Sequence, residues 1–395
     1  MKRFGLLARI IIAIILGIVI GYFANEWFIQ LFATFNGLFG NFLGFIIPLI
    51  IIGFIIPGIG FMGRGAGKLL GLTALLAYAS TILAGTIAFF IAKNVYPTIL
   101  RGQSMEIFTD PTEGLSEAFF NVEMAPPMEV VTALLLSFVV GIGIAAIKSD
   151  ALLKLSNDFR DIIQLVIEKV IIPLLPFHIF GIFANMTHAG QVATILNVFA
   201  KVFIMIVILH FFYLILQYSV AGTLSKQNPL SMLKKMSPAY FTALGTQSSA
   251  ATIPVTLKHS KTLKVRENTA DFTVPLLANI HLSGSTITIL SCALAVLFLQ
   301  GESIAFTTIL PFLLMLGVTM IAAPGVPGGA VMAAIGLLDT MLGFGPTMLS
   351  LMIALYLSQD SFGTACNVTG DGAITSITDS ISKKWNVTEI DKIQA

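Results

Sequence analysis

Long apolar runs occupy most of this chain and constrain its fold more than any other feature. They fall at residues 10–23, 42–62, 71–93, 130–147, 162–184, 192–222, 269–299, 305–341 and 346–378. A helix needs ~20 apolar residues to cross the hydrocarbon core of a bilayer, so the chain has room for about eight crossings. Only 11% of its residues are charged, whereas soluble domains average about 25%. The sequence therefore predicts an all-α polytopic membrane protein, a single membrane domain over residues 1–395.

Basic residues set the expected orientation, because Lys and Arg in short loops are retained on the cytoplasmic side. With the N-terminus inside, the clusters at 226–235, 258–266 and 383–384 all fall on that side. We expect both termini in the cytoplasm and the protein in the cell (plasma) membrane, surrounded by lipid. A net charge of +2 gives no reason to expect nucleic acid as a partner.

Two of the segments are interpreted as re-entrant helical hairpins rather than as crossings. Hairpin 1, at residues 230–259, has lysines near both ends, so both ends lie on the same side of the membrane. Hairpin 2, at 305–341, is interrupted at residues 323–329 (APGVPGG) by prolines and glycines that preclude a continuous helix. Unwound backbone at membrane depth must be buried in protein or line a water-filled cavity.

Each hairpin is followed by a long span with polar residues in its middle. These spans are 267–299, with polar residues at 279–285, and 346–378, with polar residues at 367–371. Both are expected to be broken helices. Hairpin 1 enters from the cytoplasm and hairpin 2 from outside, so hairpin and broken span occur twice as inverted repeats. This arrangement is typical of secondary transporters that bind substrate near the bilayer midplane.

Two acids in the last span carry the expected chemistry, because ionisable groups inside a membrane span mark function by default. Asp360, Thr364, Asn367 and Asp371 follow one another at steps of four, three and four, which places them on one helical face. Asp371 with the Asn367 carbonyl offers the oxygen ligands that hard cations prefer. Asp360 could hold an ammonium, and backbone amides at the tip Ser248–Ser249 could receive a carboxylate. An amino acid fits this set.

The motifs at 247–256 (QSSAATIPVT), 323–329 (APGVPGG) and 360–371 (DSFGTACNVTGD) resemble the hairpin tips and last helix of the dicarboxylate/amino acid:cation symporters, the glutamate transporter family. The likeness runs over nearly the whole chain. It implies a homotrimer of eight transmembrane helices and two re-entrant hairpins. A scaffold (about 5–62 and 130–184) would stay fixed, while a transport core (about 71–93 and 192–380) would slide across the membrane as an elevator.

The resemblance also implies roles for individual residues. Asp360 matches the acid that binds the substrate amino group, Thr364 its neighbouring hydroxyl, Asn367 and Ser249 the carboxylate contacts, and Asp371 the sodium-binding acid. The remaining expected substrate-site positions are Ser248, Gly363 and the outer gate tip, Gly325 and Val326. The remaining expected cation-site positions are Asn367, Asn279, His281 and Ser283.

Departures from the family pattern bear on the substrate. Acidic-substrate members place an arginine where Gly363 stands, and Gln247, at the other place where some relatives keep one, is neutral as well. A second substrate carboxylate would be buried without a partner, which is costly. We therefore expect a neutral amino acid such as serine, threonine or alanine. An acidic amino acid or dicarboxylate stays open as the alternative.

Other departures bear on the coupling ion, for which sodium is expected. His281 and Ser283 stand where the family has an asparagine and a second sodium-binding acid, and Ile82 follows the retained Tyr78 and Thr81 where a further hydroxyl is expected. One cation site therefore looks impaired. His281 is either a neutral, hydrogen-bonded imidazole or a titrating group that lets a proton replace one sodium ion. No other cofactor is expected.

Two further classes are weaker. An intramembrane serine hydrolase would need Ser248 or Ser249 activated by a histidine such as His281. No Gly-x-Ser-x-Gly motif surrounds either serine, so an enzyme is not expected. A channel also uses re-entrant loops, but a simple pore would not require the amino-acid-shaped set around Asp360.

Overall fold

The computed structural model describes residues 6–62, 67–100, 116–190, 192–302, 305–323 and 327–383, and every regular element in these ranges is a helix. The helices are α1 (Leu6–Phe23), α2 (Glu26–Met62), α3 (Gly67–Ile99), α4 (Val130–Ile147), α5 (Asp150–Val166), a π-helical turn (Ile167–Ile171), α6 (Ile172–His188), α7 (Val192–Ser225), α8 (Pro229–Thr246), α9 (Ser249–Lys261), α10 (Glu267–Ile280), α11 (Ser283–Leu299), α12 (Phe306–Ala322), α13 (Gly329–Leu342) and α14 (Pro346–Ser382).

Several stretches are long and apolar enough to cross a membrane. By length and composition there are 5 in the described ranges: Glu26–Gly60, Lys68–Ile99, Asp150–His188, Leu196–Ser225 and Glu267–Leu299. Shorter apolar helices lie at Ala8–Phe23, Leu135–Ile147, Phe306–Ile321 and Gly329–Leu342. The predicted all-helical class is confirmed, and the apolar helices agree with a polytopic membrane protein. The count of eight spans and two hairpins stays a prediction.

The second span begins earlier than its apolar run. Apolarity predicts 42–62, whereas α2 begins at Glu26, where the Asn25 side chain accepts a hydrogen bond from Phe28 N at 3.0 Å and caps the helix. The polar residues that interrupt the pattern have partners: Thr34 Oγ1 accepts from Phe119 N at 2.8 Å, and Asn41 Nδ2 donates to Val122 O at 2.7 Å. Hydropathy treats these polar residues as interruptions of the span. Because their side chains bond to another segment, they do not oppose helix formation, and the helix continues through them.

The fifth span is also longer than the predicted 162–184. It runs from Asp150 through α5, the π-helical turn and α6 to His188. The turn at Ile167–Ile171 immediately precedes α6, whose second residue is Pro173. Proline has no N–H to donate and its ring crowds the carbonyl of the preceding turn, so a wider turn there relieves the contact.

Helix breaks occur in both predicted hairpins. In hairpin 1, α8 ends at Thr246 and its C-cap residue Gln247 is in the left-handed conformation (φ 54°). Ser248 Oγ then caps α9 by accepting from Ala251 N at 3.2 Å. In hairpin 2, α12 ends at Ala322 and α13 begins at Gly329. The span 267–299 is broken as well, at His281 and Leu282 between α10 and α11. Proline, glycine and small polar residues thus end helices where the pattern predicts.

The last span corrects one prediction. Residues 346–378 were expected to form a helix broken near its polar residues 367–371, but α14 is continuous from Pro346 to Ser382. Its polar residues do not unwind it because their side chains bond to neighbouring helices rather than to their own backbone. The unbroken helix keeps Asp360, Thr364, Asn367 and Asp371 on one face, and all four side chains are buried.

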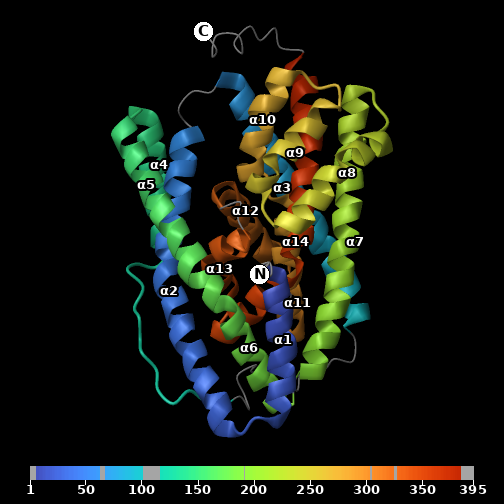
Figure 1. The fold of residues 1–395 in the computed structure, drawn as a ribbon. Coiled ribbons are helices and arrows are strands. Elements are labelled where there is room, and N and C mark those ends of the chain that lie inside the picture. Colours follow the sequence, from blue (N-terminus) through green and yellow to red (C-terminus); the bar gives the residue numbers. More distant parts are fainter. Residues whose placement is uncertain are drawn as a thin grey trace, which may run out of the picture.

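The helices pack into two groups (Figure 1). In the first, α1 packs on α6, and α2 packs on α4, α5 and α6. In the second, α14 packs against α7, α8, α9 and α11, and α3 packs on α11. Figure 1 shows α2, α4 and α5 at one side, α7 and α8 at the other, and α11 to α14 between them. The helices of hairpin 2, α12 and α13, contact both α2 of the first group and helices of the second. The division into a fixed scaffold and a moving transport core stays a prediction.

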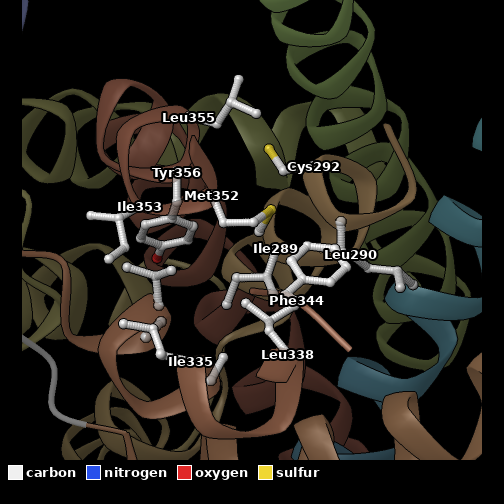
Figure 2. Close-up of a cluster of buried hydrophobic side chains, with 14 of the residues drawn as sticks. Ile289, Leu290, Cys292, Ile335, Leu338, Phe344, Met352, Ile353, Leu355 and Tyr356 are labelled. Carbon is white, nitrogen blue, oxygen red and sulfur yellow. The ribbon is translucent and has the colours of Figure 1, made fainter. Parts of the chain in front are cut away.

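A buried apolar cluster fixes the position of hairpin 2 (Figure 2). It joins α11, α13 and α14 through Ile289, Leu290, Cys292, Ile335, Leu338, Met352, Ile353, Leu355 and Tyr356, with Phe344 from the α13–α14 connection. Each of these side chains is at most a few per cent exposed. Because Tyr356 lies one helical turn before Asp360, this cluster sets the distance between hairpin 2 and the acidic face of α14.

An ion pair ties the start of α10 to the end of α14. Arg266 Nε lies 2.6 Å from Asp379 Oδ1, and Arg266 Nη2 donates to Ser382 Oγ at 2.6 Å. Asp379 is only 3% exposed. We predict that Arg266→Met lowers the free energy of unfolding by about 1–3 kcal/mol, because hydrogen bonds to a buried charge are lost. Thermal unfolding in detergent measures the effect.

The matched control is Arg160→Met. The pair between Arg160 and Asp161 is exposed on both sides, and exposed pairs contribute little, so this variant should unfold at the wild-type temperature. Equal stability of the two variants would show that the Arg266 pair does not stabilise the fold.

Candidate functional site

Asp360 is bonded to the break in hairpin 2. Its carboxylate is 4% exposed, and Oδ2 accepts a hydrogen bond from the backbone N–H of Gly328 at 2.7 Å. The hydroxyls of Tyr356 and Thr364 lie beside the same carboxylate. Gly328 has φ 76°, and a Cβ there would lie 2.9 Å from Leu357 Cδ2, so only glycine fits. The predicted ammonium-binding acid and its hydroxyl are thus together, with hairpin 2 fastened to them.

Asn367 links α14 to the broken span. Its Oδ1 accepts from Gly284 N at 2.7 Å and from Ser285 N at 3.2 Å, and its Nδ2 donates to Ser285 Oγ at 2.9 Å. These backbone N–H groups belong to the first turn of α11, which has no partners for them within the helix. Tyr356 also donates to Ser285 Oγ, at 3.1 Å. Asn367, predicted as a carboxylate and cation contact, therefore caps α11 from another helix.

The tip of hairpin 1 is the second part of the predicted substrate site. Ser249 is buried, and the Ser248 side chain caps α9. Both α8 and α9 pack against α14, so this break lies beside the helix that carries Asp360. The other predicted tip residues, Gly325 and Val326, lie outside the described residues.

Asp371 is paired with a histidine. His281 Nδ1 lies 2.9 Å from Asp371 Oδ1, and the two side chains are 0% and 1% exposed. The predicted cation-site residue Ser283 is buried nearby in sequence, and its Oγ has no hydrogen-bond partner among the described residues. Asn279 does not join this group: its side chain is exposed and donates to Pro275 O of its own helix at 2.9 Å.

Sequence reasoning missed the residues on the far side of the imidazole. His281 Nε2 lies 2.9 Å from Ser80 Oγ on α3 and 3.4 Å from Gln217 Nε2 on α7. Tyr78 and Thr81, the α3 residues singled out by the resemblance, instead donate to Leu314 O and Ala77 O. The signal for Gln217 was present, because a glutamine within an apolar span has to find a polar partner.

In the part of the chain that the structure describes, no lysine or arginine side chain lies inside the site. Among the described residues no Lys or Arg is buried. Gly363 is buried, and a Cβ there would lie 3.4 Å from Thr288 Oγ1 and 3.5 Å from Ser285 N, which is ordinary contact distance. The structured ranges also contain no group of three or more His, Cys, Asp or Glu side chains placed to hold a metal ion.

Comparison with known proteins decides the family. A family model for the sodium:dicarboxylate symporters matches residues 6–381. The chain belongs to the sodium:dicarboxylate symporter family. This confirms the resemblance drawn from the hairpin and α14 motifs.

Curated relatives of this sodium:dicarboxylate symporter family member are similar over nearly their full length. The chain is 25% identical to the serine/threonine transporter SstT of Acinetobacter baumannii (strain AYE) over 407 residues, 97% of this chain and 98% of the relative. It is 26% identical to the protein of that name from Acinetobacter baylyi (strain ATCC 33305 / BD413 / ADP1) over 396 residues, 96% and 98% of the two chains. The family and relative names denote transporters and not enzymes, so the protein is a membrane transporter, and the hydrolase alternative is dropped.

The close approach of α11 to α14 generates a prediction. A Cβ on Gly284 would lie 2.6 Å from Cys366 Cβ and would also meet Gly363 O. We predict that Gly284→Ala forces the helices apart and lowers the free energy of unfolding by about 1–3 kcal/mol. Thermal unfolding in detergent is the measurement.

Gly143→Ala on α4 is the control, since a Cβ there meets nothing within 4 Å. Alanine is a better helix former than glycine, so this variant should unfold at or slightly above the wild-type temperature. A Gly284→Ala protein as stable as Gly143→Ala would contradict the tight packing described for the site.

Proposed function

We propose that this protein imports a small neutral amino acid, of the size of serine, threonine or alanine, together with a cation. The substrate ammonium binds the Asp360 carboxylate, with Thr364 beside it. The substrate carboxylate binds near the tip of hairpin 1 at Ser248 and Ser249, and Gly325 and Val326 belong to the outer gate.

One observation carries the choice of a neutral substrate. Asp360 is a buried acid, while the described part of the chain holds no buried Lys or Arg. An ammonium balances Asp360, but a second carboxylate on the substrate would have no partner, and an unpaired buried charge is costly. The neutral residues Gly363 and Gln247 agree with this assignment. So do the names of the two relatives, which are serine/threonine transporters.

The coupling and the motion are part of the same proposal. The family name makes sodium the first cation to test, with the proton as alternative. The packing of α7, α8, α9 and α11 around α14 supports an elevator in which α3 and α7 to α14 move against α1, α2 and α4 to α6. Exposed apolar side chains along α4 and α5, such as Leu135, Val139 and Leu155, suit contacts with lipid or with other copies in a homotrimer. We place the protein in the plasma membrane with both termini cytoplasmic.

Removing the charge of Asp360 tests the substrate site. We predict that Asp360→Asn weakens the apparent affinity for L-serine about 10- to 100-fold, because a charge-assisted hydrogen bond is lost. Uptake and counterflow of labelled L-serine in proteoliposomes, under separate sodium and proton gradients, give the measurement.

Asp339→Asn is the control, because Asp339 is an exposed acid on α13; it should transport like the wild type. Unchanged affinity in Asp360→Asn would refute the ammonium assignment. Uptake that never saturates and shows no counterflow would favour a channel instead.

Restoring a positive side chain tests selectivity. We predict that Gly363→Arg lets L-aspartate compete with L-serine at least about tenfold better than in the wild type, since a buried guanidinium pairs well with a carboxylate. Competition for labelled L-serine uptake measures this. Gly363→Met, whose side chain is long but uncharged, separates the effect of charge from that of size. If L-aspartate competes equally well in the Met and Arg variants, the positive charge is not the cause.

A further inference from the structure

The hydrogen-bonded pair of His281 and Asp371 lies where the resemblance leads one to expect a sodium ion. His281 is the residue at which the chain breaks between α10 and α11, and its Nδ1 lies 2.9 Å from Asp371 Oδ1 on α14. When Asp371 is ionised its carboxylate can only accept hydrogen bonds, and the imidazole Nδ1–H is then the donor in this contact. Both side chains are fully shielded from solvent.

The imidazole is held in place from its other side by two helices. Its Nε2 faces Ser80 Oγ at 2.9 Å, and Gln217 Nε2 donates to the same Ser80 hydroxyl at 3.0 Å. Tyr213 donates to the Ser80 backbone carbonyl at 2.6 Å, which fixes α3 against α7 at this level. Both ring nitrogens are therefore engaged, and the ring cannot turn away without breaking this set of contacts.

The ring also fills the space beside the carboxylate. A Cβ on Gly370 would lie 3.0 Å from His281 Cε1 and 2.7 Å from Gln217 Oε1, so the imidazole and the Gln217 amide pack directly on the α14 backbone. Asp371 Oδ2 has no hydrogen-bond partner among the described residues. This single unpartnered oxygen cannot supply the roughly six or more oxygen ligands by which hard cations are coordinated.

We propose that His281 determines the ion selectivity of the transport core: its imidazole occupies the place beside Asp371 that a metal ion would need, and Asp371 binds no sodium. Ser80 and Gln217 act as positioning residues that hold the ring there. This inference deepens the proposed symport, on which its meaning for coupling rests, by assigning the Asp371 carboxylate to a side chain of the protein instead of to a transported metal ion.

The exchange of His281 for asparagine should open a sodium site. With the ring gone, both Asp371 oxygens, the new amide oxygen and the unpartnered Oε1 of Gln217, which lies beside Gly370, become available as ligands. Purified full-length protein is titrated with sodium chloride against choline chloride, with no amino acid present, and sodium binding is measured by thermal shift and with labelled sodium. Because substrate is absent, failure of this test is separate from failure of the proposed amino-acid transport.

Four variants give the result its meaning. Asp371→Asn should respond to sodium as the wild type does. His281→Asn should bind sodium at least about tenfold more tightly than the wild type. The double variant, His281→Asn with Asp371→Asn, should lose that gain in affinity. His178→Asn, at a buried histidine of α6 outside this pair, should respond to sodium like the wild type. If His281→Asn is not monodisperse, His281→Ala, which also vacates the place, is measured instead.

Two results would overturn the proposal. In the first, the wild type binds sodium and Asp371→Asn abolishes that binding, which would make Asp371 a sodium ligand despite the imidazole. In the second, a folded His281→Asn or His281→Ala protein gains no sodium affinity, which would show that the ring is not what keeps sodium away.

Discussion

A carboxylate inside a membrane protein has to be matched by a positive charge or by hydrogen-bond donors, and this requirement organises the centre of the molecule. Asp360 and Asp371 lie on the same buried face of α14 but satisfy it differently. Asp360 accepts a hydrogen bond from a backbone N–H at the break in hairpin 2, a donor that the proposed substrate ammonium would replace. Asp371 receives a side chain that is itself anchored by Ser80 and Gln217. The first arrangement suits an exchangeable ligand, whereas the second resembles a permanent structural contact.

Helix breaks supply the donors and acceptors that these acids need. A continuous helix uses its backbone N–H groups internally, whereas the breaks before α9, α11 and α13 leave first-turn N–H groups free to bond elsewhere. Asn367 takes up two of these groups from α11, and Asp360 takes the N–H of Gly328 next to α13. The site is therefore assembled from helix ends around one unbroken helix, and the apolar cluster of Figure 2 holds those ends at their positions.

The sequence predicted the breaks well where the residue types themselves oppose a helix. Proline and glycine around residues 323–329 and the small polar tip at 247–249 end helices by their own conformational preferences, so no knowledge of neighbours was needed. The last span was misjudged for the opposite reason. Asn367 and Asp371 oppose a helix only when they bond to their own backbone, and in this fold they bond to α11 and to His281 instead. Likewise Ser80 could not be paired with His281 from sequence, because the two are distant in the chain and meet only through packing.

The continuity of α14 limits how the two acids can respond to a ligand. At about 1.5 Å per residue, Asp360 and Asp371 are about 16 Å apart along one stiff rod. A continuous helix of this kind moves as one stiff unit, so a displacement of Asp360 along the helix axis also displaces Asp371. Under the proposed transport cycle, deformation on binding would therefore fall on the interrupted segments around α14, and α14 itself would serve as their common fixed reference.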